Sequence, residues 1–600
     1  MNELDTKLNQ EFAGKVVRKD LTKLVKGNAI VPTYVLEYLL GQYCATDDED
    51  TINEGVERVK SIIAEHFVHR DEAQIVKSTI REKGSHRVID KVTVRLNDRK
   101  DIYEASFANL GLTKVEISTD IIKQHKKLLS GGVWCIITMG YVPTEDRDSS
   151  PWIIETLKPI QISSINLEEF EKAREAFSKE EWIDALMQTI GLNPNEFSFR
   201  SKLLQLSRLV PFAENNYNLI ELGPKGTGKS HIYSEMSPHG ILISGGEVTK
   251  AKLFINNNTG DIGLVGYWDV VAYDEFAGKS KNVDRGLVDI MKNYMANKSF
   301  SRGTEVYGAS ASMTFVGNTD HSVPYMLKHS DLFEALPDVY YDTAFLDRVH
   351  AYLPGWEVHK LRNEMFTDNY GFIVDYLAEI LKELRKEDHT QDYKEYFELD
   401  NSITTRDRDS ISKSFSGLMK VIYPNGKYDE ADAKEMLEFA IENRMRVKQQ
   451  LIIMDETFEE VDFSYTVKSS GDEVQVETLE IIEFEGKKPT AESDSTNEQD
   501  ETEADQSQDN SSEKLNEGQV ILRDNQTGIS YMELFGDYLK GATEVKVVDP
   551  YIRLPYQVRN FMELARVIGD NKPKEEEVQL HLVTNNNEEY LMNSKDAFTE

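Results

Sequence analysis

The sequence predicts a multidomain α/β protein whose core is a parallel sheet carrying a glycine-rich loop. Residues 223–230 read Gly-Pro-Lys-Gly-Thr-Gly-Lys-Ser, a complete G-x-x-x-x-G-K-S motif, and they follow the apolar run 219–222. Residues 220–350 alternate β-rich runs with helical segments, which is typical of a parallel sheet. The length of 600 residues allows about three to five domains.

The front of the chain predicts a mixed α+β domain over residues 1–150. Segments 35–43 and 56–67 have helical apolar spacing, and segment 88–96 alternates apolar and polar residues as a strand does. Residues 151–208 follow as a predicted helical connector, in which Ser178 and Glu181 have the spacing of a capping box.

The glycine-rich loop is the predicted phosphate-binding element of the core, residues 209–370. Between a strand and a helix, its glycines let backbone N–H groups turn inward and bind phosphate oxygens. Lys229 then reaches the β- and γ-phosphates and the Ser230 hydroxyl binds Mg²⁺, so the motif predicts an enzyme that binds ATP with Mg²⁺. The predicted nucleotide contacts are Gly223, Pro224, Lys225, Gly226, Thr227, Gly228, Lys229 and Ser230.

A second motif supplies two carboxylates. Residues 270–275 read as an apolar strand that ends in Asp274 and Glu275. In a nucleotide triphosphatase Asp274 would hold Mg²⁺ and Glu275 would polarise the attacking water. The alternative is a buried strand with a solvated acidic end, which the preceding phosphate loop disfavours.

Three polar residues complete the predicted catalytic set. Asn318 ends a β-run where AAA+ ATPases keep a first sensor, and Arg348 stands where they carry an arginine finger that acts on a neighbouring subunit. Arg406, with Arg408 as a competitor, opens a helical segment and is the candidate second sensor. An ordinary surface ion pair is the alternative for Arg348. The order of these motifs indicates an AAA+ ATPase rather than a kinase or GTPase.

The remaining segments follow in order. A helical lid is predicted over 371–455, with helices at 372–385 and 430–450, and a β-rich extension over 456–486. The segment 487–515 is polar and acidic, which predicts a disordered linker. A small α/β domain occupies 516–600, with strands at 518–522, 544–548 and 578–584 around a helix at 555–567.

The composition indicates in which cellular compartment the protein works and which partners it has. The formal net charge of the chain is −36, yet residues 1–130 hold 21 basic and 21 acidic residues. The acidic excess therefore lies after residue 130, and the first 130 residues are neutral overall. Two cysteines, Cys44 and Cys135, fit a reducing compartment, and the first ten residues contain no apolar signal region. The longest apolar stretch is too short to span a bilayer. We therefore expect a soluble, cytoplasmic protein with no membrane partner.

Residues 292–305 resemble the helix and hairpin that precede the first sensor in MCM-like helicases. In those helicases the hairpin points into a central pore and touches DNA, which makes Lys298 and Arg302 candidate DNA contacts. The alternative is a solvated loop, because single basic residues are common on surfaces.

Three long runs, 214–230, 263–275 and 342–357, resemble the BrxL family of Lon-related AAA+ proteins from BREX phage-defence systems. The resemblance covers about residues 10–470. It implies an ATPase that forms a hexameric ring or stacked rings, hydrolyses ATP at subunit interfaces, engages or translocates on double-stranded DNA and works with other phage-defence proteins.

The resemblance also implies an N-terminal DNA-binding domain, and a basic stretch there is compatible with one. The alternative is a solvated helix and strand face, because no aromatic stacking partners are interleaved. The basic residues are Lys77, Arg81, Lys83, Arg87, Lys91, Arg95, Arg99 and Lys100.

The C-terminus departs from the BrxL pattern, which ends in a Lon-protease-like domain. Residues 525–539 and 548–553 resemble instead the phospholipase-D-like domain at the C-terminus of MIT-domain proteins. The catalytic pattern H-x-K-x-x-x-x-D is missing around His581, so we expect no phosphodiesterase chemistry. Without a recognisable Ser–Lys pair, protease activity is not expected either.

Two other functions remain open from the sequence. One is a Lon-related ATP-dependent protease or unfoldase, for which Tyr267 and Trp268 could form an aromatic pore loop, although their place before the acidic strand favours core positions. The other is a binding module in which ATP is a structural switch. The acidic balance of 575–600 disfavours docking of that end on anionic lipid.

Overall fold

The computed structural model divides the chain into two units, residues 1–482 and residues 483–600, which are described separately. It describes residues 2–26, 31–129, 132–144, 150–160, 165–246, 248–256, 262–278, 284–302, 305–480, 531–540, 542–548, 555–571 and 578–583. The predicted linker 487–515 and the predicted strand 518–522 lie outside the described residues.

A five-stranded sheet forms the core of the first unit, and every neighbouring pair of strands runs parallel. The predicted parallel sheet is therefore confirmed. Its order is β13-β7-β12-β9-β8, and most strand residues are fully buried, as expected where helices cover both faces. The strands are β7 (Asn218–Leu222), β8 (Gly240–Ile243), β9 (Val270–Tyr273), β12 (Ser312–Gly317) and β13 (Ala351–Pro354).

Long helices pack around this sheet. α11 (Lys229–Glu235) follows β7, and α18 (Glu430–Met454) packs against the edge strand β13 and against α17 (Thr405–Ile422). The helix predicted at 372–385 begins later, as α16 (Val374–Leu384), because Tyr370–Phe372 forms strand β14. Another helix, α13 (Arg285–Asn297), follows the acidic strand.

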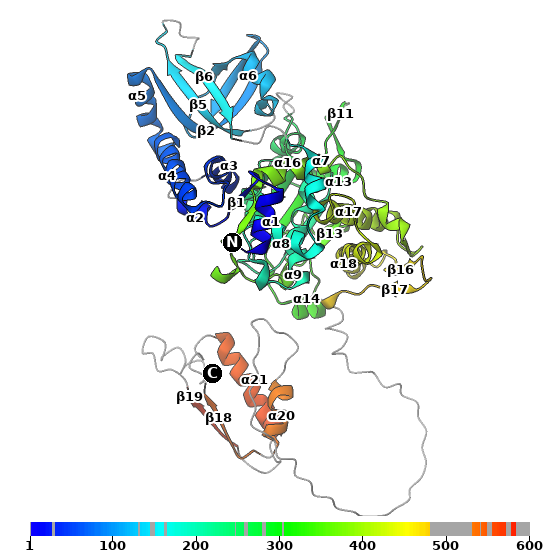
Figure 1. The fold of residues 1–600 in the computed structure, drawn as a ribbon. Coiled ribbons are helices and arrows are strands. Elements are labelled where there is room, and N and C mark those ends of the chain that lie inside the picture. The colour runs from blue at the N-terminus through cyan, green and yellow to red at the C-terminus, as the bar shows by residue number, and fades with distance from the viewer. Residues whose placement is uncertain are drawn as a thin grey trace, which may run out of the picture. The chain divides into compact units, whose positions relative to one another are not determined.

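The first residues of the chain pack with this body. α1 (Glu3–Glu11) contacts α8 (Lys179–Thr189) (Figure 1), and β1 (Val16–Arg18) pairs antiparallel with β14. α2 (Leu21–Lys26) and α3 (Thr33–Tyr43) complete this N-terminal segment, and α3 packs on α16. The contacts of residues 3–43 thus cross the predicted boundary at residue 150.

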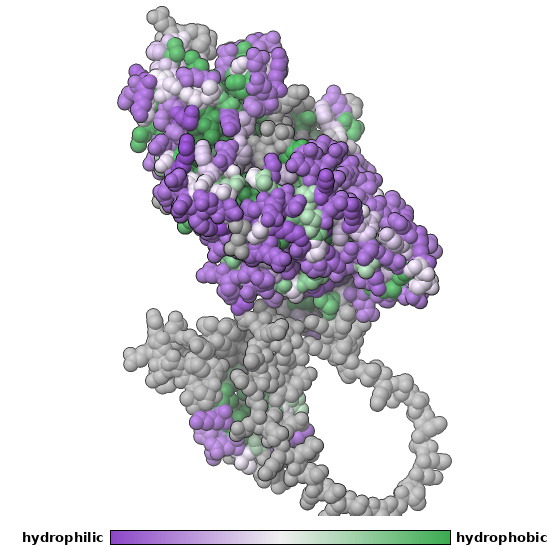
Figure 2. Space-filling view, viewed as in Figure 1, coloured by the Kyte–Doolittle hydropathy of each residue, from purple (hydrophilic) through white to green (hydrophobic). Residues whose placement is uncertain are grey.

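A five-stranded antiparallel sheet follows, in the order β4-β3-β2-β5-β6. The strand predicted at 88–96 is confirmed as the middle of β2, and the helices predicted at 35–43 and 56–67 are α3 and α4. Hydrophilic side chains cover most of the described body around the parallel sheet on the face in Figure 2, and apolar ones gather mainly over this antiparallel sheet. The elements are α4 (Glu49–His66), α5 (Ala73–Lys83), β2 (Ser85–Asn97), β3 (Ile102–Phe107), β4 (Val115–Ile117), α6 (Thr119–Gln124), β5 (Val133–Tyr141) and β6 (Trp152–Pro159).

The connector predicted over 151–208 is helical only from α7 (Leu167–Arg174) onward, with α8 and α9 (Phe199–Ser207) inside it and α10 (Val210–Ala213) just after it. Its first residues instead form β6, because they pair with β5 at the edge of the antiparallel sheet, so a helical connector starting at 151 is wrong. The capping box at Ser178 is confirmed, because its side chain accepts from Glu181 N–H while the Glu181 side chain accepts from Ser178 N–H. Rings from the N-terminal segment, the connector and β14 meet in one core, with Phe12 against Phe170, Trp182 and Phe372.

Strand pairing joins the predicted lid to the extension after it. β15 (Phe397–Leu399), β16 (Ser464–Val467) and β17 (Glu473–Gln475) form an antiparallel sheet in that order. β15 lies before α17 in the chain, and β16 lies after α18. The two predicted segments therefore fold together.

The second unit contains two helices and a parallel strand pair among its described residues. β18 (Glu544–Val548) pairs with β19 (Gln579–Val583), with α20 (Tyr531–Leu539) before them and α21 (Pro555–Asn571) between them. These positions confirm the strands predicted at 544–548 and 578–584 and the helix at 555–567. Among the described residues, no helix combines the length and apolar character needed to cross a membrane.

Candidate nucleotide-binding site

The glycine-rich loop joins the end of β7 to the start of α11, the strand–loop–helix context that the motif requires. Gly226 and Gly228 have φ of 84° and 78°, a left-handed conformation that favours glycine. A Cβ at Gly223 would come within 2.3 Å of the Gly355 backbone. The loop conformation therefore depends on glycine at three of its positions.

The Lys229 side chain folds back into the loop. Its ammonium donates to the carbonyl oxygens of Gly223 at 3.1 Å and Pro224 at 2.7 Å. Burial lowers the pKa of Lys229 below its usual value. A phosphate group in the loop would give this desolvated cation an anionic partner in place of neutral carbonyls.

The two motifs meet at a hydroxyl–carboxylate contact. The Ser230 hydroxyl donates to Asp274 Oδ1 at 2.8 Å, although the residues are 44 positions apart. Both oxygens are of the type that Mg²⁺ accepts. Glu275 follows with φ of 52°, and its N–H donates to Asp274 Oδ1 at 2.9 Å. The turn leaves the Glu275 side chain exposed beside the pair.

Asn318 lies at the same edge of the sheet because of the strand order. β12 runs between β7 and β9, so its C-terminal end opens between the loop and the acidic pair. The Gly223 N–H donates to the Gly317 carbonyl at 3.3 Å, which joins the loop to the residue before Asn318. The half-buried Asn318 is therefore brought together with the two motifs.

The backbone on both sides of Arg348 is held by α18. The guanidinium of buried Arg444 donates to the carbonyl oxygens of Asp347 at 3.2 Å and Val349 at 2.5 Å, and to Asp347 Oδ1 at 2.7 Å. Arg348 itself donates to the carbonyl of Ala344, while its Nε is buried without a hydrogen-bond partner among the described residues.

Arg406 lies next to Arg348, the candidate arginine finger. At the start of α17, Arg406 forms an ion pair with Asp347, the residue before Arg348. Its competitor Arg408 donates to the carbonyl of Asp400 at 3.0 Å. Arg406 and Arg348 therefore lie near each other, a proximity that the sequence did not predict.

Sequence reasoning missed a buried ion pair behind the loop. Arg208 Nη2 lies 2.6 Å from Glu221 Oε1, and its Nη1 donates to the Thr227 carbonyl at 3.0 Å. The side chains of Arg208 and Glu221 are 1% and 0% exposed. One signal was available, because Glu221 is the only charged residue of the strand before the loop and a buried charge needs a partner.

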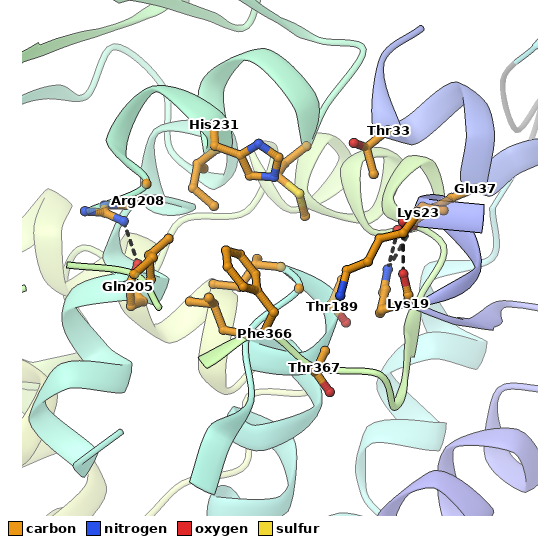
Figure 3. A pocket seen from close by; sticks show the side chains of 18 residues that line it. Lys19, Lys23, Thr33, Glu37, Thr189, Gln205, Arg208, His231, Phe366 and Thr367 are labelled. Carbon is orange, nitrogen blue, oxygen red and sulfur yellow. Dashed lines mark hydrogen bonds and ion pairs between the residues drawn. The ribbon is translucent and has the colours of Figure 1, made fainter. Parts of the chain in front are cut away.

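A cavity of about 190 Å³ adjoins the loop (Figure 3). An engineered protein cavity of about 150 Å³ binds benzene, so the volume here is large enough for a planar ring. Four parts of the chain line it: the N-terminal segment, residues 189–192 with 205 and 208, the loop and its helix, and residues 361–367. The lining combines apolar side chains, Ile190, Leu192, Ile232, Met236 and Phe366 among them, with polar and charged ones such as Lys19, Glu37 and His231.

The candidate DNA residues lie on α5 and β2. Arg87, Lys91 and Arg95 are spaced by four in a strand, which places them on one face of the sheet, and Arg87 and Arg95 are exposed. Lys91 is half-buried, with its ammonium 5.6 Å from the ring centroid of Trp268. Lys77 is half-buried, while Arg81, Lys83, Arg99 and Lys100 are exposed.

The predicted hairpin after α13 is confirmed. β10 (Ser299–Arg302) pairs antiparallel with β11 (Glu305–Gly308), and Lys298 begins it as the left-handed cap of α13, with φ of 56°. Lys298 is exposed, whereas the side chain of Arg302 lies outside the described residues.

The prediction of core positions for Tyr267 and Trp268 is wrong for the first. Tyr267 is 44% exposed and Trp268 is half-buried. The cause is the short 3₁₀ turn of 264–266, which ends the apolar periodicity before the acidic strand.

Comparison with known proteins adds three family matches. Residues 152–464 match the model described as Lon-like protease BrxL-like, ATPase domain, and residues 10–141 match BREX system Lon protease-like protein BrxL N-terminal. Residues 528–600 match Phospholipase D-like domain at C-terminus of MIT.

Two curated relatives are similar over most of the chain. The Lon-like protease BrxL of Bacillus cereus (strain H3081.97) is 53% identical over 476 residues, which cover 79% of this chain and 70% of the relative. The Lon-like protease BrxL of Escherichia coli O9:H4 (strain HS) is 49% identical over 464 residues, covering 77% of this chain and 67% of the relative.

Proposed function

This chain belongs to the BrxL-like family of Lon-related ATPases of BREX systems, and from that premise we propose that it hydrolyses ATP at the subunit interfaces of a ring to engage double-stranded DNA in phage defence. The observation that carries the ATPase part is the 2.8 Å contact between Ser230 and Asp274. It joins a phosphate-binding loop to an acidic strand in the geometry of a metal–nucleotide site.

Each member of this site has a proposed role. The loop N–H groups and Lys229 bind the phosphates, and Ser230 with Asp274 would hold Mg²⁺, which neutralises charge that develops on the phosphoryl oxygens. Glu275 orients and polarises the attacking water, and Asn318 positions that water from the neighbouring strand.

The cavity beside Gly228 is the proposed site of the base. Its apolar side chains suit a planar ring and its polar ones could bind the ring nitrogens, because base sites are concave and combine apolar surface with polar groups. Adenine would lie in this cavity, which Ile232 of α11, residues 190–192 and Phe366 line.

The ring of subunits is proposed from the surroundings of Arg348, the candidate arginine finger. Arg348 has a buried Nε without a partner among the described residues, and a phosphate of a neighbouring subunit's nucleotide would supply one. Since Arg406 is joined to Asp347, we assign it to the same interface. A hexamer or stacked rings would place each Arg348 at the next subunit's loop.

DNA engagement is proposed for two surfaces. The exposed basic residues of α5 and β2 would neutralise phosphates, and the β10–β11 hairpin with Lys298 and Arg302 would reach the duplex from the ATPase body. Other defence proteins are the proposed further partners, as the BREX membership of the family suggests.

A helical lid at 371–455, which shares a small sheet with the extension after it, and a phospholipase-D-like domain at 516–600 are part of the proposal. The parallel pair β18–β19 and the family match at 528–600 support the last domain. This domain would recruit a partner or effector and not cleave a phosphodiester, since the catalytic H-x-K-x-x-x-x-D pattern is missing.

A second candidate is a Lon-related protease or protein unfoldase. The 44% exposure of Tyr267 favours it, because an exposed aromatic residue could grip a polypeptide. The related proteins are also named Lon-like proteases.

Steady-state ATP hydrolysis with and without duplex DNA tests these functions. We expect DNA to stimulate turnover, Lys229→Ala to abolish it, and Glu275→Gln to bind ATP while turning over at least about 100-fold more slowly. Stimulation by an unfolded protein but not by DNA would favour the second candidate, and normal turnover in Glu275→Gln would refute the role of Glu275.

A further inference from the structure

One wall of the base cavity comes from a part of the chain about 200 positions before the loop. Lys19, Lys23, Thr33 and Glu37 lie together on one side of the cavity (Figure 3), and Thr22 also lines it. They belong to the later part of the N-terminal segment, the described residues 16–26 and 31–43, whose helix α3 packs directly on α4.

The segment is fixed to the ATPase body by buried polar contacts. Lys19 Nζ lies 2.8 Å from Glu37 Oε2, and their side chains are 4% and 2% exposed. Lys19 also donates to the Phe372 carbonyl at 2.6 Å, and Glu37 accepts from Val374 N–H at 2.9 Å. A buried ion pair that also forms its other hydrogen bonds is restricted to one geometry. The Lys19–Glu37 pair therefore fixes this wall in place against the ATPase body.

A direct contact joins the segment to the helix that starts at the loop. The N–H and hydroxyl of Thr33 donate to Glu235 Oε2 at 2.7 and 2.9 Å. Pro32, the N-cap of α3, makes no side-chain capping bond, so the Glu235 carboxylate serves as the cap from another element. Glu235 is the last residue of α11, one turn beyond the cavity residue Ile232.

We propose that β1, α2 and α3, in the described residues 16–26 and 31–43, are the closing wall of the base site, and that Glu235 positions this wall against α11. Lys23 stands at the mouth, with its ammonium 5.8 Å from the Phe366 ring and its side chain 61% exposed. Glu235 is thus a positioning residue for base recognition and plays no part in phosphate binding. The inference rests on the proposed nucleotide site.

Two ligands, one without the base, distinguish phosphate binding by the loop from base recognition in the cavity. Tripolyphosphate with Mg²⁺ fills the loop alone, whereas a non-hydrolysable ATP analogue fills the loop and the cavity. In hydrogen exchange on the full chain, the analogue should slow exchange in the loop and in residues 16–26 and 31–43. Tripolyphosphate should slow exchange in the loop only.

The variant Glu235→Ala removes the cap and should abolish the protection of 31–43. We expect it to weaken analogue binding about fivefold, which corresponds to about 1 kcal/mol, and to leave tripolyphosphate binding unchanged. The matched control is Glu57→Ala, since Glu57 is an exposed acidic residue of α4 that pairs with Lys60 at 2.8 Å. It should bind both ligands as the unmodified chain does.

Two results would overturn the inference while leaving the nucleotide site intact. One is an analogue that protects the loop but not residues 16–43. The other is a Glu235→Ala variant that loses both ligands equally, which would indicate general damage to the helix. If neither ligand protected the loop, the nucleotide site and the wall would both be refuted.

Discussion

The buried ion pair behind the loop gives the sharpest test of how this chain positions a nucleotide. Replacing Arg208 by methionine would leave the Glu221 carboxylate buried and unpaired, because both side chains are inaccessible and 2.6 Å apart. Breaking such a pair costs about 3–5 kcal/mol. At about 2–4 °C per kcal/mol, the unfolding midpoint of the ATPase body should fall by about 6–20 °C.

A double substitution separates stability from binding. Arg208→Met combined with Glu221→Leu removes both charges, so most of the lost stability should return. Nucleotide binding should not return, because Arg208 also donates to the Thr227 carbonyl at 3.0 Å in the loop. Loss of that charged hydrogen bond should weaken ATP binding by about tenfold or more in both variants.

Scanning calorimetry and titration with a fluorescent ATP analogue measure the two effects. The matched control is Lys386→Met, since the Lys386–Glu383 pair is exposed and should be worth at most about 1 kcal/mol. The reasoning fails if the double variant is as unstable as Arg208→Met, or if its ATP affinity recovers together with its stability.

Three further predictions follow from other contacts. Arg444→Met should lower the maximal rate of ATP hydrolysis by about tenfold or more with little change in KM, because it releases the backbone on both sides of Arg348; an unchanged rate would contradict this. Burial lowers the pKa of His350 to about 3, so the unfolded chain binds an extra proton below about pH 6.5 and stability falls by about 1.4 kcal/mol per pH unit there. His350→Asn should reduce the pH slope of stability in melting curves between pH 7.5 and 5 by that amount, while other histidines whose pKa is lowered, such as His231 and His239, keep theirs, and an equal slope would refute it. Arg95→Ala should reduce the log–log salt slope of DNA binding by about 0.9, whereas Lys91→Ala, whose ammonium already faces a ring, should leave it unchanged in titrations at several salt concentrations.

The local elements were largely predictable because their signals are local. The strand at 88–96, the capping box at Ser178 and the hairpin after 297 each depend on neighbouring residues, and the structure contains all three. The error at 372–385 has a tertiary cause, since Tyr370–Phe372 pairs with β1 and so cannot begin the helix. Tyr267 was misplaced because an apolar residue near a buried strand can still face solvent.

The sequence by itself determined the glycine loop, the acidic strand and the order of the polar residues after them, because each depends on a short run whose backbone conformation is set by its own residues. Only the tertiary structure decided what surrounds them. It placed β12 between β7 and β9, joined Arg406 to Asp347, and brought Thr33 onto Glu235 beside the cavity, a contact across 202 positions. Such contacts arise from packing of whole elements, and a short window of sequence carries no record of which distant element will pack against it.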